Sequence, residues 1–117
     1  MLFIHYPKCS TCKRAQAWLD ANGIQYESRH IKEQPPTAAE LAAWHAQSGQ
    51  PLRRFFNTSG ILYREMQLSA KLPEMSEKEQ LALLASDGML IKRPLLITDK
   101  AVLIGFREKA WEAALQP

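Results

Sequence analysis

Two cysteines, Cys9 and Cys12, are the residues whose type and spacing point most directly to chemistry. They are the only cysteines in the 117-residue sequence, and two residues separate them. The pair follows a short apolar run and precedes a helical pattern, so it is predicted to lie at a strand-to-helix turn. Two thiols in such a turn predict thiol–disulfide chemistry.

The predicted helix start favours a thiolate at Cys9. Cys9 falls near the N-cap, where unpaired backbone N–H groups and the helix dipole stabilise negative charge. Lys8 and Lys13 add positive charge nearby, so the pKa of Cys9 should lie below the ordinary cysteine value. Cys12 lies on the same helix face, so the two sulfurs can meet. We predict that Cys9 attacks, forming a mixed disulfide, and that Cys12 resolves it.

Other uses of two cysteines are less compatible with this sequence. A structural zinc site needs four ligands, but there is no second cysteine pair, and His5, His30 and His45 do not form a ligand motif. We therefore predict no metal site. A purely structural disulfide would close a very small loop and restrict the unfolded chain little. Two inert thiols that share this spacing by coincidence remain an alternative.

The composition is that of an ordinary globular protein. The chain has 46% hydrophobic and 23% charged residues and a net charge of +3, with a pI of about 9.0. This charge is too small to predict direct nucleic-acid binding. No apolar run approaches the length of a membrane span, and no signal peptide is recognisable. Reduced cysteines in such a chain predict a cytoplasmic location.

Local patterns divide the chain into β-α-β, an all-helical middle, and β-β-α. Thr37 with Glu40, and Ser76 with Glu79, have the spacing of capping boxes and predict two helix starts in the middle segment. The strands are predicted at Leu2–His5, Gln25–His30, Leu95–Ile97 and Val102–Ile104. The helices are predicted at Ser10–Ala21, Thr37–Gln47, Leu52–Phe56 (one short turn), Tyr63–Leu72 (the least clear pattern), Gln80–Ala85 and Phe106–Leu115.

This order predicts a thioredoxin-like α/β fold. The two outer segments would pair into one mixed four-stranded sheet, and the helical middle, about 37–90, would be an insertion within a single domain spanning 1–117. The Cys-x-x-Cys motif occupies the first strand-to-helix turn, where such folds carry their redox pair. Pro94 opens the third strand, where these folds place a cis proline. A cis bond there would leave a free backbone edge for a substrate.

With these elements assigned, the chain resembles the arsenate reductase/Spx family over nearly its full length. Within that family it resembles the small Spx/MgsR-like and YusI-like proteins of Gram-positive bacteria. Several segments in the same order carry the resemblance: Tyr6-Pro7-Lys8-Cys9 with Cys12, Glu33-Gln34-Pro35-Pro36, Phe55-Phe56-Asn57-Thr58-Ser59-Gly60 with Tyr63-Arg64, Ser86 to Pro94, and Gly105-Phe106. The resemblance implies the same fold as the residue pattern.

The resemblance also implies roles for individual residues. In the glutaredoxin-dependent arsenate reductases one cysteine attacks arsenate, and Cys9 matches it. A histidine four residues earlier lowers the pKa of that cysteine, and His5 matches this histidine; the alternative is a half-buried strand histidine bonded to backbone. Arg93 and Arg107 match two arginines of the oxyanion site, and here they would bind an anion or a carboxylate of glutathione.

Two departures from the family pattern favour disulfides over arsenate as the substrate. The third arginine of the oxyanion site falls at or near Phe55, and a phenylalanine cannot replace a bidentate guanidinium. The family's single cysteine is followed by a serine at the position that Cys12 occupies in this chain. Both departures strengthen dithiol chemistry.

We therefore predict a thiol–disulfide oxidoreductase with no bound cofactor. Its partners would be a thiol or disulfide substrate and a reductant, either glutathione as a thiol co-substrate or a glutaredoxin-type protein. The resemblance implies two alternatives. The first is a redox-sensing transcriptional regulator, like Spx, that binds the C-terminal domain of the RNA polymerase α subunit. The second, less favoured, is a glutaredoxin-linked arsenate reductase.

Overall fold

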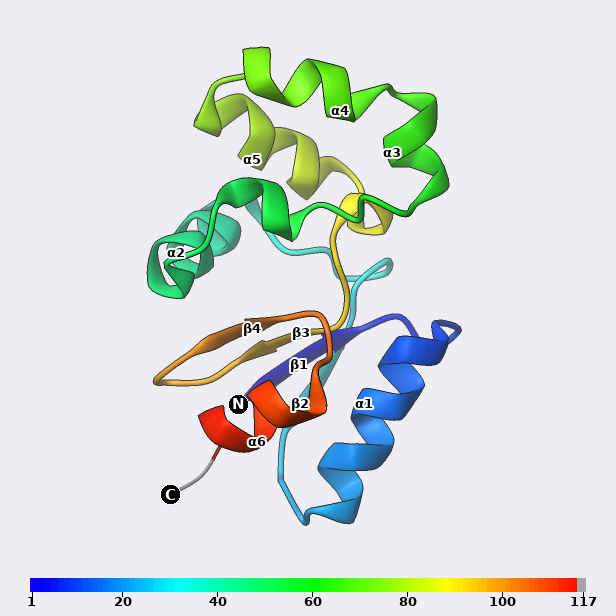
Figure 1. Cartoon of the computed structure of the whole chain (residues 1–117), viewed down its shortest axis with the longest axis vertical. Helices are drawn as coiled ribbons and strands as arrows, with labels where there is room; N and C mark the ends of the chain where they lie inside the picture. Colours follow the sequence, from blue (N-terminus) through cyan, green and yellow to red (C-terminus); the bar gives the residue numbers. More distant parts are fainter. Residues whose placement is uncertain (116–117) are drawn as a thin grey trace. The chain divides into compact units, whose positions relative to one another are not determined.

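The computed structural model describes residues 1–115, and the chain divides into two compact units. The first unit comprises Met1–His30 and the chain from Arg93 onward, and the second comprises Ile31–Lys92. The predicted helical insertion, about 37–90, falls within the second unit. Residues 116–117 of the predicted domain lie outside the described residues. Figure 1 follows the elements along the chain.

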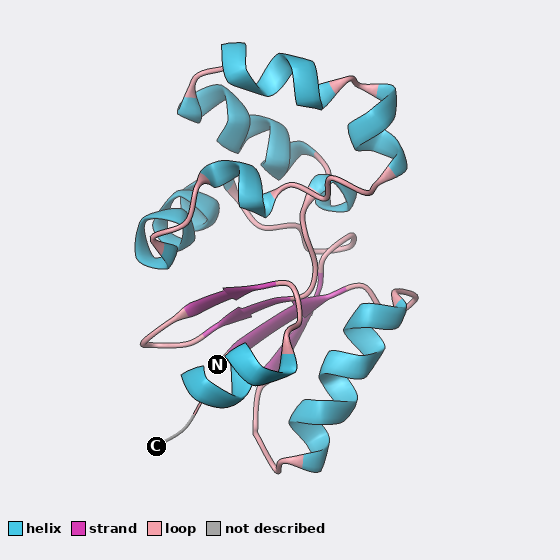
Figure 2. Ribbon diagram, in the orientation of Figure 1, coloured by secondary structure: helices cyan, strands magenta, loops and turns pink. Residues whose placement is uncertain are grey.

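The first unit is built on one four-stranded mixed sheet, drawn in magenta in Figure 2. The strand order is β2-β1-β3-β4. β1 pairs in parallel with β2 and antiparallel with β3, which pairs antiparallel with β4. The predicted α/β class and mixed sheet are confirmed. The elements of this unit are β1 (Leu2–His5), α1 (Ser10–Ala21), β2 (Glu27–His30), β3 (Leu95–Ile97), β4 (Val102–Ile104) and α6 (Glu108–Ala114).

One face of this sheet carries the core that positions α1. Phe3 of β1 and Leu96 of β3 are direct cross-strand partners, so their side chains project from the same face. Both are fully buried, and they pack with Ala15 and Leu19 of α1 and with Trp111 of α6. Helices α1 and α6 therefore cover the same face of the sheet. The strand β1 and the helix α1 that flank the cysteines are thus fixed by shared apolar burial.

The ends of α1 follow from local chemistry. The helix spans Ser10–Ala21, as predicted, with Cys9 at the N-cap in an extended conformation. At the other end Gly23 has a φ of +66°, a conformation that glycine adopts without steric cost. Its N–H donates to the carbonyl of Asp20 at 3.1 Å, which satisfies one of the last carbonyls of the helix.

The second unit is helical. Both predicted capping boxes are present: Thr37 with Glu40 starts α2, and Ser76 with Glu79 starts α5. In each box the cap hydroxyl accepts from the backbone N–H of the glutamate, and the carboxylate accepts in return. The elements of this unit are α2 (Ala38–Ser48), η1 (Leu52–Phe55), α3 (Ile61–Glu65), α4 (Leu68–Lys71), η2 (Leu72–Glu74), α5 (Glu77–Ser86) and η3 (Gly88–Leu90).

The stretch predicted as one short helix over Tyr63–Leu72 is instead divided into α3 and α4. The break lies at Gln67, which has a φ of +55°, a left-handed conformation that cannot continue a helix. Gln67 still serves α4, because its carbonyl accepts from the N–H groups of Ala70 and Lys71, both at 3.2 Å. A further 3-10 turn, η2, includes Pro73 near its start, where the missing proline N–H costs no hydrogen bond.

Candidate active site

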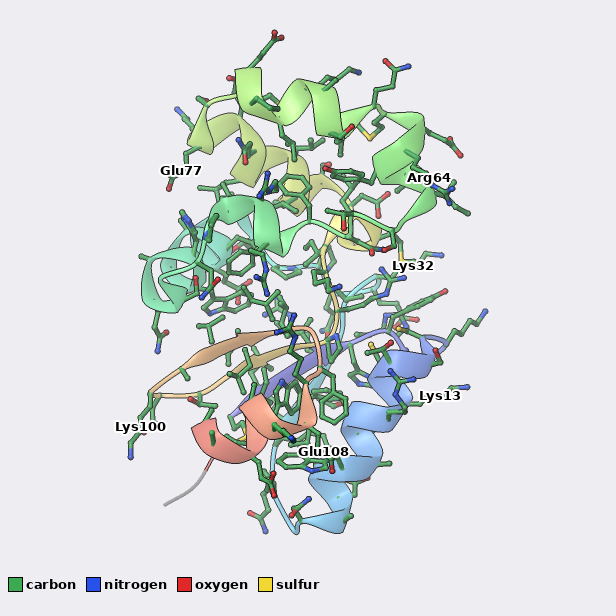
Figure 3. All side chains as sticks on the ribbon, in the orientation of Figure 1. Lys13, Lys32, Arg64, Glu77, Lys100 and Glu108 are labelled. Carbon is green, nitrogen blue, oxygen red and sulfur yellow. The ribbon has the colours of Figure 1, made fainter. Side chains whose placement is uncertain are left out.

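The two cysteines lie at the start of α1, both as free thiols. The turn before the helix is closed by the Cys9 N–H, which donates to the Tyr6 carbonyl at 2.9 Å. Cys9 is partly exposed, whereas Cys12, within the first turn, is fully buried. Lys13, labelled in Figure 3, is exposed at the outer surface of the same turn. A substrate can therefore reach Cys9 directly, and Cys12 is shielded.

The surroundings of Cys9 favour its thiolate. Partial burial acts to raise the pKa of Cys9, but the backbone N–H and thiol of Cys12, the backbone N–H of Thr11 and the charge of Arg93 together lower it below the ordinary value. The side chain makes no capping hydrogen bond. The backbone N–H groups of Thr11 and Cys12 point toward the Cys9 sulfur at the helix start, where the helix dipole also favours negative charge.

The surroundings of Cys12 favour its protonated thiol. Burial, together with the nearby Cys9 sulfur, raises the pKa of Cys12 to about 12. Two groups oppose this increase: the Tyr6 N–H, which donates to the Cys12 sulfur at 3.5 Å, and the positive charge of Arg93. The two thiols are therefore shifted in opposite directions, as attacking and resolving roles require.

Arg93 is the cation whose charge acts on both thiols. It precedes the buried Pro94 through a cis peptide bond, directly before β3. Its guanidinium carbon lies 5.4 Å from the centre of the Tyr6 ring. Its Nε and Nη1 atoms are buried, and neither has a hydrogen-bond partner among residues 1–115. Two buried donors beside a reactive sulfur can receive an anion.

His5 lies at the end of β1 and is 8% exposed. Its Nε2 is 2.7 Å from the Ser28 hydroxyl, and its ring stacks on Phe3. Burial and the neighbouring His30 lower the pKa of His5, so the neutral imidazole is favoured. This environment matches the alternative of a buried strand histidine, although its partner is a side chain rather than backbone. A direct effect of His5 on Cys9 stays a prediction.

Arg107 and Phe55 have surroundings that can each be described within their own unit. Arg107 is exposed at the N-cap of α6 and makes no side-chain cap, and its role in anion binding stays a prediction. Phe55, predicted to fall at or near the place of the third family arginine, belongs to the second unit. It is fully buried there, with its ring 6.1 Å from that of His45.

Tyr6 is the site residue that the sequence interpretation did not single out. It contacts Cys9, Cys12 and Arg93 through three different groups: its carbonyl, its N–H and its ring. An aromatic residue between the strand and Pro7 was the available signal. Tyr6 could be recognised as part of the site only once its contact with Arg93, which is distant in the sequence, was known.

Two further properties bear on the chemistry. Among the described residues, no group of three or more His, Cys, Asp or Glu side chains has an arrangement that could hold a metal ion. In the same part of the chain, no helix is both long and apolar enough to cross a membrane.

Comparison with known proteins finds similar sequences over nearly the whole chain. The model of the ArsC family matches residues 4–114. The uncharacterised protein YusI of Bacillus subtilis is 53% identical, with 96% of this chain and 95% of that protein covered. The regulatory protein MgsR of the same organism is 28% identical over 91% of this chain and 82% of that protein.

Solved structures give the same result. A putative ArsC family related protein from Bacteroides fragilis is 53% identical with a TM-score of 0.93, covering 96% of this chain and 94% of that one. A possible arsenate reductase from Streptococcus mutans is 46% identical with a TM-score of 0.87, covering 95% and 96%. Both the fold and the region of the cysteines therefore fall within the similarity.

Proposed function

The chain belongs to the ArsC family, and from that premise we propose that it is a thiol–disulfide oxidoreductase acting through Cys9 and Cys12. The observation that carries this proposal is the opposite shift of the two thiols. The pKa of Cys9 is lowered while that of Cys12 is raised to about 12. An exposed thiolate beside a shielded thiol is the division of labour that disulfide exchange needs.

The reaction consists of two exchanges. The Cys9 thiolate attacks one sulfur of a substrate disulfide, forms a mixed disulfide and releases the other sulfur as a thiolate, which takes a proton from water. Cys12 then gives its proton to solvent and attacks the Cys9 sulfur, which forms the Cys9–Cys12 disulfide and releases the second substrate thiolate. The substrate gains two electrons, and the pair of cysteines loses them.

An external thiol must return those electrons. We propose glutathione or a glutaredoxin-type protein as the donor. The buried Nε and Nη1 donors of Arg93 suit a carboxylate of such a thiol, and Arg107 is a second candidate for this contact. Disulfide reduction of this kind belongs to a reducing compartment, and we propose the cytoplasm.

Two serine variants test this function. Cys9→Ser should abolish reduction of insulin or of glutathione mixed disulfides. Cys12→Ser should stop turnover after the first exchange and accumulate a mixed disulfide at Cys9, visible by mass spectrometry as an added substrate mass. Ser10→Ala, an exposed change in the same turn, serves as the control. Full activity of Cys9→Ser would contradict the proposal.

A redox-sensing regulator is the second candidate function. Its support is the set of relatives named as regulators: MgsR at 28% identity, and the global transcriptional regulator Spx of Enterococcus faecalis at 26%. In this reading the Cys9–Cys12 disulfide would change binding to the C-terminal domain of the RNA polymerase α subunit. A pull-down with that purified domain, with oxidised and with reduced chain, discriminates; no binding in either state contradicts it.

Arsenate reduction is the third candidate, supported by the similarity to the possible arsenate reductase of Streptococcus mutans. It is disfavoured because a buried phenylalanine, Phe55, stands near the place of the third arginine. An assay with arsenate, glutathione and glutaredoxin decides this point. We expect no turnover above the rate of the Cys9→Ser variant.

A further inference from the structure

Tyr6 contacts both cysteines and the arginine whose charge acts on their thiols. Its carbonyl accepts from the Cys9 N–H at 2.9 Å, and its own N–H donates to the Cys12 sulfur at 3.5 Å. Its ring faces the Arg93 guanidinium carbon at 5.4 Å. We propose that Tyr6 is a positioning residue whose ring holds the Arg93 guanidinium beside Cys9 and Cys12. This inference rests on the proposed dithiol function.

Arg93 needs such a partner because little else restrains it. Arginine side chains lose considerable rotamer freedom when they are fixed, and carboxylates are the usual partners that offset this loss. Among residues 1–115 no hydrogen bond reaches Nε or Nη1 of Arg93. The face of an aromatic ring attracts a guanidinium through its quadrupole, and does so more strongly where water is excluded. The Tyr6 ring can therefore orient the guanidinium while leaving two N–H donors available.

The ring, rather than the hydroxyl, carries this role. The hydroxyl of Tyr6 makes no hydrogen bond within the described part of the chain. Its ring also packs on His30 in a T-shaped arrangement, with the ring centres 5.7 Å apart and the planes at 84°. A phenylalanine keeps the ring face and its packing. An aliphatic residue keeps the backbone bonds to Cys9 and Cys12 but loses the ring. Comparing Tyr6→Phe with Tyr6→Leu therefore distinguishes the contribution of the ring from those of the hydroxyl and the backbone.

The position of Arg93 affects both chemical steps. Its charge lowers the pKa of Cys9 and opposes the burial that raises the pKa of Cys12. A guanidinium that turns away leaves a less acidic attacking thiol and a resolving thiol that is harder to deprotonate. Further titratable groups lie near Tyr6: His5 and Lys8 in the sequence, and His30 against its ring. Neither substitution of Tyr6 changes their charge directly.

The first measurement is the pKa of Cys9 in the full chain carrying Cys12→Ser. The pKa is determined from the ultraviolet absorbance of the thiolate as a function of pH. We expect Tyr6→Leu to raise this pKa and Tyr6→Phe to leave it at the parent value. At a pH below the Cys9 pKa, alkylation by iodoacetamide should slow by about threefold to tenfold in Tyr6→Leu. An unchanged pKa in Tyr6→Leu, or an equal rise in Tyr6→Phe, overturns the proposal.

The second measurement separates positioning of Arg93 from a general structural effect. In an Arg93→Met background, Tyr6→Leu should cause no further rise in the pKa of Cys9. A rise as large as in the parent would overturn the proposal. If Tyr6→Leu fails to fold, Tyr6→Met replaces it, since methionine also lacks a ring face. If the parent lacks disulfide turnover but the Tyr6 effects are present, the proposed enzymatic function fails while the positioning role stands.

Discussion

Cys9 at the N-cap of α1 and Cys12 in its first turn are three residues apart but differ in burial and in the direction of their pKa shifts. Cys9 is partly exposed at the N-cap, and the N–H and thiol of Cys12 are among the groups that lower its pKa. Cys12 is fully buried, and its pKa is raised to about 12. The buried Cys12 thiol thus stabilises the Cys9 thiolate. The difference between the two pKa values therefore arises in part from the interaction of the two side chains.

Selective alkylation is the first consequence. At pH 7 iodoacetamide should modify Cys9 at least about tenfold faster than Cys12, because only the thiolate reacts and only Cys9 has a lowered pKa. The alkylation rate of Cys9 should rise with pH and reach its plateau at a lower pH than the alkylation rate of a free cysteine. Tandem mass spectrometry of the peptide holding both residues measures the ratio. Equal labelling of the two in the folded chain would contradict the assigned roles.

The contribution of the Cys12 thiol to Cys9 can be measured separately. Cys12→Ala removes the side chain that donates to the Cys9 sulfur, so the pKa of Cys9 should rise relative to the parent. Cys12→Ser retains a donor of similar size, and the pKa of Cys9 should stay below that of the alanine variant. Thiolate absorbance against pH gives both values. If the two variants titrate alike, the thiol of Cys12 has no role in stabilising the Cys9 thiolate.

Much of this site could be predicted from local sequence. The limits of α1 and the N-cap position of Cys9 follow from apolar spacing and from the Asn22-Gly23 stop. The capping boxes at Thr37 and Ser76 follow from a three-residue spacing. In each case the interacting groups are within four residues of one another in the sequence, so their spacing determines whether they can meet.

The contacts between segments that are distant in the sequence were harder to predict. Arg93 acts on the thiols because β3 pairs antiparallel with β1, with Leu95 opposite Ile4. A mixed sheet that joins the two outer segments was predicted from the order of elements, but the pairing of β3 with β1 and the position of Arg93 over the Tyr6 ring were not. The left-handed Gln67 was not predicted either, since glutamine is a good helix former and no local signal marks the break.

The environment of His5 predicts a pH dependence of stability. Burial and the charge of His30 lower its pKa in the folded chain below the unfolded value of 6.5. The unfolded chain therefore binds the proton more readily, and the stability from neutral His5 is present above pH 6.5 and is lost as the pH falls through the folded pKa. His5→Gln removes this proton uptake. The drop in Tm between pH 7 and pH 5 should be smaller in His5→Gln than in the parent, and an equal drop would contradict the assignment.

Gly88 in the second unit should tolerate no side chain. A Cβ there would lie 2.0 Å from the carbonyl oxygen of Ile31 and 2.8 Å from its carbonyl carbon, and both are backbone atoms that cannot turn aside. We expect Gly88→Ala to lower the free energy of unfolding by about 2–4 kcal/mol. Gly23→Ala is the comparison without a clash, because nothing lies within 4 Å of its Cβ.

This comparison isolates the clash from the backbone conformation. Gly23 has a φ of +66°, so an alanine there should cost about 1 kcal/mol from conformation alone. Urea unfolding of both variants gives the two free energies, with equal m-values as the check that the unfolding reaction is the same. A loss in Gly88→Ala no larger than in Gly23→Ala would mean that the backbone at Ile31 moves easily, and that the close approach of η3 to Ile31 does not hold this part of the second unit together.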